Sequence, residues 1–519
     1  MFLILLYTLY SILLQLEAKR ILAIFPLNEK SHNNVLDALA IGLAKRGHQI
    51  DVITHFEKKN PPVNYKTIIN LNGTRDDFVN NLTIEYCTKQ TDDSIPFYAF
   101  TAGNEICNLM SLKSMQKVIQ NPKVYDLVIT EVFGANCYIG FGYIFKIPVV
   151  TVATNLGLSW TGDGVGSPTA TATFADVLMD KYEILTFWDR LKNTMISQIS
   201  KYRFFSYTEK AQTEAIRKYL NPNIPNIREI EKIVALTFVN SYHNPFGIRA
   251  LTPGMIEIGG LHIEGNNEKL SPDLERWMNE STHGVIYFSL GSMVLIETLQ
   301  ENSLLSIYQV FSKISPMRVL MKIVDKKKLP SGIPKNIRIP SWIPQIPVLK
   351  HRNTKLFITH GGMLGIQEAL YYQIPVIGIP LYGDQFRNIA TLTSKNVAVE
   401  INYKNITRES LTEALTTILN DTKYKEAVIY ESKLFRDRPM KAMDTAIFWV
   451  EYVMRNGATT LRSPAVNMHW WQAELLDVYG FISLCCIITT YSLIFLLKKI
   501  IQITFKLVRN TKEDDKKYN

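Results

Sequence analysis

The chain has little cysteine, no basic stripe and one long stretch without charge. Five cysteines occur in 519 residues and none forms a Cys-x-x-Cys pair, which excludes the common zinc and redox spacings. The net charge is +10, but no stripe of Lys and Arg is interleaved with aromatic residues, so nucleic-acid binding is not predicted. Hydrophobic residues make up 47% and charged residues 20%, a balance that excludes a disordered chain.

The stretch without charge covers residues 478–497. Twenty helical residues span about 30 Å, the thickness of the bilayer hydrocarbon, so a transmembrane helix is predicted there. Lys498 and Lys499 follow at once and indicate that the tail, residues 498–519, is cytosolic. Lys516 and Lys517 resemble the dilysine retrieval signal of endoplasmic reticulum membrane proteins. The pattern predicts a single-pass type I protein whose body is lumenal.

The amino-terminal segment supports a lumenal body. Residues 2–16 are almost wholly apolar and precede a small-residue cleavage site at Ala18, so residues 1–18 are predicted to be a signal peptide. An uncleaved anchor is the alternative, because no Lys or Arg precedes the apolar run. Five sequons fit a glycoprotein: Asn72, Asn81, Asn279, Asn405 and Asn420. Three cysteines would be lumenal, so they cannot all pair internally: Cys87, Cys107 and Cys137.

Two stretches of the body alternate strands with helices, which predicts an α/β fold of two facing Rossmann-like, doubly wound domains. In the first, the polar residues 28–34 are interpreted as a turn between a strand at 21–25 and a helix at 35–45. Further strands are expected at 49–54, 126–130, 148–154, 284–289, 318–323, 355–359 and 376–379. The predicted divisions are an acceptor-binding domain (19–243), a Pro/Gly-rich linker (244–260), a nucleotide-binding domain (261–440) and C-terminal helices with a pre-membrane segment (441–477).

Polar residues gather just after the strands of the second domain, where ligands of such sheets bind. His360, Gly361 and Gly362 end a strand and open a helix, whose free N–H groups suit a diphosphate. Ser292 follows another strand and can reach the same phosphates. The side chains that suit the rest of a nucleotide sugar are Trp342 for a stacked base, Glu368 for a ribose diol, and Asp384 and Gln385 for sugar hydroxyls.

This order closely resembles the nucleotide-sugar signature of the animal UDP-glycosyltransferases, especially arthropod members. The matching residues stand as Trp342-Ile343-Pro344-Gln345, His360-Gly361-Gly362, Glu368 and Asp384-Gln385. The resemblance covers nearly the whole chain and implies a B-type glycosyltransferase fold that binds a UDP-sugar as co-substrate. It further implies that Gln345 bonds the uridine and that Arg249 approaches the phosphates. Where the family often has Asn, this chain has Leu364, which removes one polar contact to the donor.

The resemblance also implies the catalytic pair. Ser31-His32 matches the family's Ser-His after the first strand, which makes His32 the general base that deprotonates an acceptor hydroxyl. The family's orienting Asp is replaced by Glu131, whose reach is one methylene longer. No Asp-x-Asp occurs, the pair with which many glycosyltransferases hold a metal, so no metal requirement is expected. One base on one face implies a single displacement with inversion.

The predicted reaction is hexose transfer from a UDP-sugar, with UDP-glucose favoured over UDP-glucuronate, to a small lipophilic acceptor, as in detoxification. Residues 56–220 are rich in Phe, Tyr and Ile, which suggests an apolar acceptor. Two alternatives stay open: a lipid glycosyltransferase that acts on a ceramide-like acceptor, and a catalytically weak binding protein of the same fold. A homo-oligomer also stays possible.

Overall fold

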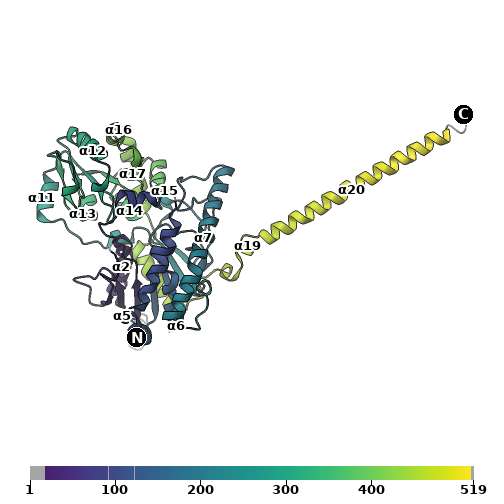
Figure 1. The fold of residues 1–519 in the computed structure, drawn as a ribbon, viewed down its shortest axis with the longest axis horizontal. Coiled ribbons are helices and arrows are strands. Elements are labelled where there is room, and N and C mark those ends of the chain that lie inside the picture. The colour runs from purple at the N-terminus through teal and green to yellow at the C-terminus, as the bar shows by residue number, and fades with distance from the viewer. Residues whose placement is uncertain (1–17, 77, 92, 122, 516–519) are drawn as a thin grey trace, which may run out of the picture. The chain divides into compact units, whose positions relative to one another are not determined.

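A computed structural model describes residues 18–515 apart from 77, 92 and 122. Nearly all of the predicted signal peptide, and the lysine pair at 516–517, therefore lie outside the described residues. Contacts divide the chain into two units, Met1–Ser463 and Pro464–Asn519. The first unit holds both sheets, and the second holds the long C-terminal helix (Figure 1).

The first sheet is wholly parallel and has seven strands in the order β3-β2-β1-β4-β5-β6-β7. Its strands are β1 (Arg20–Phe25), β2 (Gln49–Thr54), β3 (Tyr65–Asn70), β4 (Leu127–Glu131), β5 (Val149–Ala153), β6 (Val234–Val239) and β7 (Met255–Glu257). The helices between residues 30 and 246 are α2 (Lys30–Lys45), α3 (Ile84–Lys89), α4 (Glu105–Cys107), α5 (Lys113–Gln120), α6 (Gly140–Phe145), α7 (Phe187–Tyr219), α8 (Ile227–Glu231) and α9 (His243–Phe246). Helices cover both faces of this sheet, so most strand residues are buried and apolar; the edge strand β3 differs, with Lys66 and Asn70 exposed.

The second sheet is also parallel, with six strands in the order β10-β9-β8-β11-β12-β13. Its strands are β8 (Val285–Ser289), β9 (Arg318–Met321), β10 (Ile337–Arg338), β11 (Thr354–Thr359), β12 (Val376–Gly378) and β13 (Ala398–Glu400). The helices between residues 261 and 436 are α10 (Leu261–Glu264), α11 (Pro272–Glu280), α12 (Glu301–Lys313), α13 (Gln345–Lys350), α14 (Met363–Tyr371), α15 (Gln385–Ser394), α16 (Arg408–Asn420) and α17 (Thr422–Arg436). The two parallel α/β sheets confirm the predicted fold class.

The two halves exchange segments. Residues 80–87 leave the first half, and Leu82 pairs with Val294 in a parallel bridge, so Leu82 and Ile84 are buried in the core of the second half. In return, helix α18 (Ala442–Asn456) packs against α2, with Ala446 and Val450 in the core of the first half. A segment of the first half therefore completes the core of the second half, and a helix that follows the second half completes the core of the first.

Two sequence predictions differ from the structure. The polar segment at 28–34 is not a turn throughout, because α2 begins at Lys30; the apolar periodicity starts only at Val35, since the first helical turn faces a cavity. The predicted linker 244–260 contains α9 and ends in β7, which pairs with β6 as the edge of the first sheet. Met255 and Ile256 are too few to signal a strand on their own.

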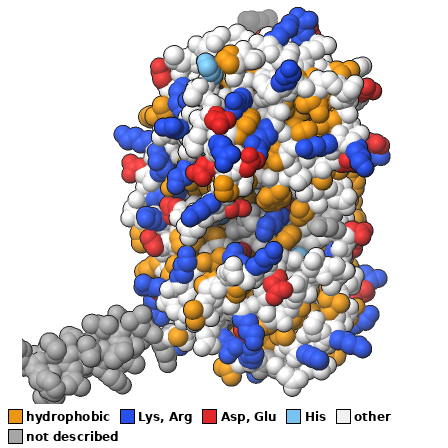
Figure 2. Space-filling view, turned by 90° about the vertical axis from the view of Figure 1, so that its left-hand side faces the viewer, with side chains coloured by type: hydrophobic (Ala, Val, Ile, Leu, Met, Phe, Trp, Pro, Cys, Tyr) orange, Lys and Arg blue, Asp and Glu red, His pale blue; other side chains and the backbone are white. Residues whose placement is uncertain are grey.

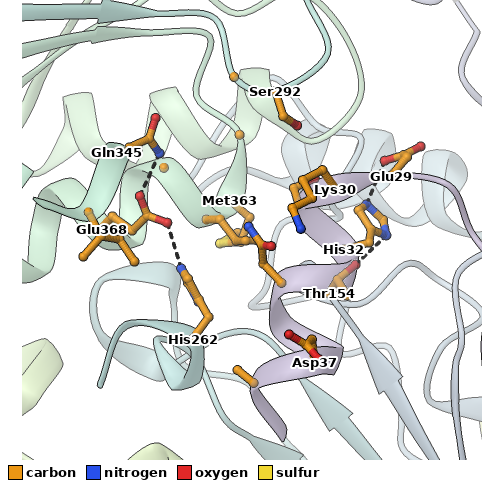
Figure 3. Close-up of a pocket in the computed structure, with 18 of the residues that line it drawn as sticks. Glu29, Lys30, His32, Asp37, Thr154, His262, Ser292, Gln345, Met363 and Glu368 are labelled. Atoms are coloured by element: carbon orange, nitrogen blue, oxygen red, sulfur yellow. Dashed lines mark hydrogen bonds and ion pairs between the residues drawn. The ribbon is translucent and has the colours of Figure 1, made fainter. Parts of the chain in front are cut away.

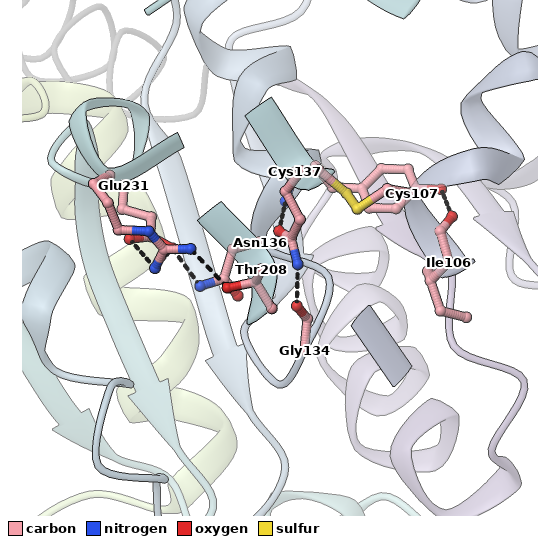
Figure 4. Close-up of a disulfide and its surroundings, with 10 residues drawn as sticks. Ile106, Cys107, Gly134, Asn136, Cys137, Thr208 and Glu231 are labelled. Atoms are coloured by element: carbon pink, nitrogen blue, oxygen red, sulfur yellow. Dashed lines mark hydrogen bonds and ion pairs between the residues drawn. A yellow bond between two sulfur atoms is a disulfide. The ribbon is translucent and has the colours of Figure 1, made fainter. Parts of the chain in front are cut away.

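A disulfide joins Cys107 at the end of α4 to Cys137 in a short helical turn (Figure 4). Cys87 is unpaired and buried. Gln212 of α7 fixes the same turn, because its amide accepts from the backbone N–H of Cys137 and donates to the carbonyl of Gly134. Two links, one covalent and one polar, thus hold this turn beside the end of β4.

The second unit contains α19 (Trp470–Ala473) and α20 (Leu476–Asp515). Residues 476–510 of α20 are long and apolar enough to cross a membrane. They contain the predicted span, 478–497, and the helix fits a membrane anchor.

Candidate active site

A cavity of about 1010 Å³ is lined by both halves of the first unit. Figure 2 shows a hollow near the middle of one face, where charged side chains of both signs are interspersed. Figure 3 draws 18 of the residues that line the cavity. Nine of the predicted site residues line this cavity: His32, Ser292, Trp342, Gln345, His360, Gly362, Glu368, Asp384 and Gln385. Residues far apart in the sequence therefore meet in one place.

The parallel sheets explain this convergence. His32 follows β1, Ser292 follows β8, His360 follows β11 and Asp384 follows β12. In a parallel sheet all carboxyl ends lie at one edge, and the loops that leave this edge form the binding crevice. The cavity is built from such loops of both sheets.

His360 is enclosed by two glycines. A Cβ atom at Gly291 would lie 2.6 Å from His360 Cε1, and a Cβ atom at Gly362 would lie 2.8 Å from Nε2. A side chain at either position would collide with the imidazole, which would have to shift. Burial, with a smaller contribution from Lys322, lowers the pKa of His360 to about 4. The ring is therefore neutral at physiological pH and keeps one N–H to donate.

The amino-terminal end of α14 opens beside this imidazole. The N-cap residue is Gly362, so no side chain caps the first N–H groups of the helix. Gly362, Met363 and Leu364 line the cavity. Free N–H groups and the positive end of the helix dipole make such a position suitable for an anion. Leu364 adds an apolar side chain here, packed against the core of the first half.

Lys322, directly after β9, brings a cation into the same region. Its ammonium donates to the carbonyl of Gly291 at 2.6 Å and lies 5.8 Å from the centre of the Trp342 ring. Burial lowers the pKa of Lys322 to about 8, so it is largely charged at neutral pH. Trp342 is 47% exposed at the cavity wall, which leaves its ring available for stacking.

Glu368 is held from two sides. Gln345 Nε2 donates to one carboxylate oxygen at 2.7 Å, and His262 Nε2 lies 3.1 Å from the other (Figure 3). The amide oxygen of Gln345 accepts from Tyr287 at 3.1 Å. Both the oxygen and the nitrogen of the Gln345 amide are thus hydrogen-bonded within the protein. Gln345 therefore orients the carboxylate of Glu368, in addition to any contact with a ligand.

Asp384 and Gln385 are set in a rigid loop. Gln385 accepts from the backbone N–H groups of Leu381 and Tyr382 at 2.9 and 3.2 Å, which leaves its amide nitrogen as the part that can bind a ligand. Asn388 donates to Asp384 at 2.8 Å. Burial raises the pKa of Asp384, although Asn388 and His32 oppose that rise.

His32 lies in the first turn of α2 and contacts Glu131, the last residue of β4. The distance from His32 Nδ1 to Glu131 Oε1 is 2.5 Å, so the longer side chain reaches the imidazole. Thr154 joins them, 2.9 Å from Nδ1 and 2.8 Å from Glu131. The ring of Phe133 meets the imidazole edge-on at 4.7 Å. Glu131 itself does not line the cavity, which suits an orienting group.

The second nitrogen of His32 is also occupied. Glu29 Oε2 lies 3.1 Å from His32 Nε2, and both carboxylates beside the ring are buried. Burial alone would lower the pKa of His32, but the charges of Glu131 and Glu29 outweigh it and raise the pKa to about 9. The imidazole of the ligand-free protein is therefore mostly protonated at neutral pH.

Aromatic and aliphatic side chains line the cavity next to His32. They come from residues 78–98, from Phe133 and from the loop before α15: Phe78, Leu82, Tyr86, Phe97, Tyr98, Phe133 and Tyr382. Tyr98 and Phe133 meet edge-to-face at 5.0 Å, in front of the imidazole. An apolar ring system would be desolvated here with one hydroxyl near His32.

Two predicted donor residues do not line the cavity. Arg249 lies at a separate small cavity, over the ring of Phe174 at 4.9 Å and 3.3 Å from Ser241 Oγ, so its predicted approach to the phosphates does not match its position. Gly361 faces Ile389, with φ +85°. Its role is the turn that presents His360, because an L side chain is strained in that conformation.

Four residues at the site were missed from the sequence: Glu29, Thr154, His262 and Lys322. Each acts on a predicted residue: Glu29 and Thr154 contact His32, His262 contacts Glu368, and the charge of Lys322 lowers the pKa of His360. Lys322 and Thr154 share one signal that would have found them, since both follow a buried strand directly. Glu29 and His262 carry no such signal, because only the folded chain brings their side chains to His32 and Glu368.

Solved structures share this architecture. One, the crystal structure of UDP-glucose: anthocyanidin 3-O-glucosyltransferase in complex with UDP, covers 85% of this chain and all of its own, with a TM-score of 0.56 at 16% identity. A glycotransferase of kitacinnamycin covers 84% of this chain and 98% of its own, with a TM-score of 0.53 at 16% identity. The fold is therefore that of the B-type glycosyltransferases.

The family follows from the sequence comparisons. The model described as UDP-glucoronosyl and UDP-glucosyl transferase matches residues 31–514. UDP-glucosyltransferase 2 of Dactylopius coccus is 33% identical over 94% of this chain and 96% of its own. UDP-glucuronosyltransferase 2A3 of Homo sapiens is 36% identical over 64% of this chain and 62% of its own. The chain belongs to the UDP-glycosyltransferase family, a family of enzymes.

Proposed function

We propose that the chain transfers a hexose from UDP-glucose to a hydroxyl group of a small lipophilic acceptor. The single observation that carries this is the shared cavity. His360, whose surroundings suit a diphosphate, and His32, which suits the role of base, both line this one space.

The donor is assigned to the second half. The diphosphate takes the N–H groups that open α14, the neutral imidazole of His360 and the ammonium of Lys322. Uracil stacks on Trp342, and the ribose diol binds Glu368, whose carboxylate is already oriented by His262 and Gln345. Asp384 and the amide nitrogen of Gln385 bind the hexose, which places its anomeric carbon toward His32.

The reaction is a single displacement. The acceptor hydroxyl gives its proton to His32 Nε2, its oxygen bonds to the anomeric carbon, and the bond from that carbon to the diphosphate breaks with both electrons going to UDP. Glu131 keeps Nδ1 oriented and stabilises the imidazolium that forms. Because the base lies on one face, an α-linked donor gives a β-glycoside.

Leaving-group stabilisation is assigned to the protein alone. His360, Lys322 and the helix N-terminus offer hydrogen bonds and positive charge where negative charge develops. We therefore propose that no metal ion is required. Two departures from the family pattern, Glu131 and Leu364, motivated a catalytically weak binding protein as the alternative. Glu131 contacts His32, so of these two only Leu364 still favours that alternative.

Two observations favour glucose over glucuronate. Glu29 and Asp384 both act electrostatically on His32, so a glucuronate carboxylate would enter an already acidic region. Arg249, which would offer a counter-charge, lies elsewhere. The relative with the printed name UDP-glucosyltransferase 2 agrees with this choice. The apolar lining beside His32 favours a lipophilic acceptor, as in detoxification.

The proposed location is the endoplasmic reticulum membrane, with a lumenal glycosylated body after removal of a signal peptide. Helix α20 supports the anchor. The disulfide between Cys107 and Cys137 supports a lumenal body, because disulfides persist in oxidising compartments.

Calorimetry with UDP tests the donor site on the intact chain in detergent micelles. Saturable heat supports it, and the absence of heat contradicts the proposed function. Assays with UDP-glucose, UDP-galactose and UDP-glucuronate against a panel of phenols then rank the donors. A preference for UDP-glucuronate would contradict the sugar assignment while leaving the fold and the reaction class intact.

A further inference from the structure

The imidazole of His32 is enclosed by carboxylates at both of its nitrogens. Glu131 lies 2.5 Å from Nδ1. Glu29 lies 3.1 Å from Nε2, and Figure 3 draws this second pair. Glu29 is the N-cap of α2, three residues before His32, so the first turn of the helix fixes their proximity. Its side chain makes no cap hydrogen bond and turns to the imidazole instead.

This arrangement restricts which atom can act as a base. Nδ1 is held by Glu131 and Thr154, both buried behind the ring. Only Nε2 faces the cavity, and Glu29 occupies it. An acceptor hydroxyl that approaches His32 must therefore take the place of Glu29 at this nitrogen.

Three carboxylates act on the ring. Glu29 comes from the start of α2, Glu131 from the end of β4 and Asp384 from the loop before α15. The other groups in contact, Thr154 and Phe133, are uncharged. Burial, Glu131 and Asp384 raise the pKa of Glu29, while His32 lowers it. Glu29 and His32 thus form a buried pair in which the pKa of each depends on the charge of the other.

We propose that Glu29 is a positioning residue that holds His32 Nε2 until the acceptor hydroxyl replaces it, and that this exchange sets the pH range in which His32 acts as the base. The inference rests on the proposed transfer reaction. When Glu29 withdraws, the imidazole loses one of its two carboxylate partners and releases its Nε2 proton to the solvent in the cavity, which leaves that nitrogen free to accept the proton of the acceptor hydroxyl. Substrate binding thereby converts a protonated imidazole into a base.

Glu29→Gln tests this inference, because it keeps the shape and removes the charge. The acid limb of the kcat/KM profile should move to lower pH by about one unit or more, the usual effect of an opposite charge at this distance. UDP affinity should not change. Glu57→Gln serves as the matched control, since Glu57 bonds Asn70 at the surface, and its limb should coincide with that of the unaltered chain.

A second measurement needs no variant. The kcat/KM profile reports the free enzyme and the kcat profile reports the substrate complex. If the acceptor displaces Glu29, the acid limb of kcat lies at lower pH than that of kcat/KM. Coincident limbs in the unaltered chain, or a Glu29→Gln variant that is slower at every pH with its limb unmoved, would overturn the inference.

Different results would contradict the proposed function and the proposed role of Glu29. If the unaltered chain neither binds UDP nor transfers sugar, the proposed function fails. Suppose instead that the unaltered chain transfers sugar and that His32→Ala abolishes this transfer. If the acid limb of the pH profile is then the same for kcat and kcat/KM and does not move in Glu29→Gln, only the role of Glu29 is contradicted.

Discussion

His32 and His360 are the same side chain in two opposite environments. His32, in the first half, lies between carboxylates that raise its pKa to about 9. His360, in the second half, lies between Gly291 and Gly362, where burial and then Lys322 lower its pKa to about 4. One imidazole is thus prepared to exchange a proton and the other to stay neutral and donate a hydrogen bond. The difference shows that partners, not residue type, decide what a histidine does.

Loss of the base has the largest expected effect. His32→Ala removes the group that accepts the proton, so kcat/KM should fall by about 10²–10⁴-fold, the usual contribution of general acid–base catalysis. UDP affinity, measured by calorimetry, should be unchanged because His32 belongs to the other half. His283→Ala, at an exposed histidine, is the control and should keep full activity. Unchanged turnover in His32→Ala would contradict the mechanism.

Loss of His360, the neutral hydrogen-bond donor, has the second largest expected effect on activity. His360→Ala should lower kcat by about 10²–10³-fold, as removal of one donor to developing negative charge does elsewhere. UDP affinity should fall as well, in contrast to His32→Ala. His360→Asn keeps an N–H donor and should recover part of both quantities. If the two alanine variants changed UDP affinity equally, the division of roles between the halves would be wrong.

Orientation of Glu368 should matter for ribose recognition. His262→Ala removes a buried partner of that carboxylate, so UDP affinity should fall by about 10–100-fold, as for a hydrogen bond to a charged group. His262→Gln keeps a donor and should lose less. The loss should be smaller for 2′-deoxy-UDP, which makes fewer bonds to Glu368. An equal loss for both nucleotides would indicate a general structural effect.

The space around His360 provides a smaller test. In Gly291→Ala the new Cβ would displace the imidazole, so UDP affinity should fall and the free energy of unfolding should drop by about 1–3 kcal/mol. Gly332 has a similar φ, +90°, with no atom within 4 Å of its Cβ position. Gly332→Ala therefore carries the backbone strain alone and should bind UDP normally in the same titration.

The smallest expected effect is that of pH on donor binding. Because the pKa of His360 is about 4, its protonation hardly changes between pH 5 and 7. Affinity for UDP-glucose should stay nearly constant over this range. Transfer should rise over the same range, because the acid limb of His32 lies above it in the free enzyme. Parallel profiles for binding and transfer would contradict the contrast between the two histidines.

Local patterns predicted eight of the thirteen strands in the described residues and missed β3, β6, β7, β10 and β13. The run at 49–54 matches β2, and the other expected strands differ by one or two residues, because buried parallel strands are continuous apolar runs. The start of α2 was misplaced because its first turn carries polar side chains toward the cavity. The edge strand β7 was missed because three residues give no periodicity.

The site was only half visible in the sequence. Residues such as His360 and Glu368 follow one another in a fixed order along the chain, so the order itself signals them. The residues that set the pKa values and orientations of these side chains do not follow such an order along the chain. Lys322 reaches His360 across the sheet, and Glu131 reaches His32 over about a hundred residues. Such pairings depend on tertiary structure, and no window of sequence contains both members.

The exchange of segments between the halves limits how the chain can be cut. A fragment that ends at residue 440 would lack α18 and would expose the apolar face of α2 that Ala446 and Val450 cover. A fragment that begins at residue 261 would lose Leu82 and Ile84 from its core. We therefore expect each half to be less stable alone than in the whole body, and recombinant production of the catalytic body to be best served by one polypeptide that continues through residue 463.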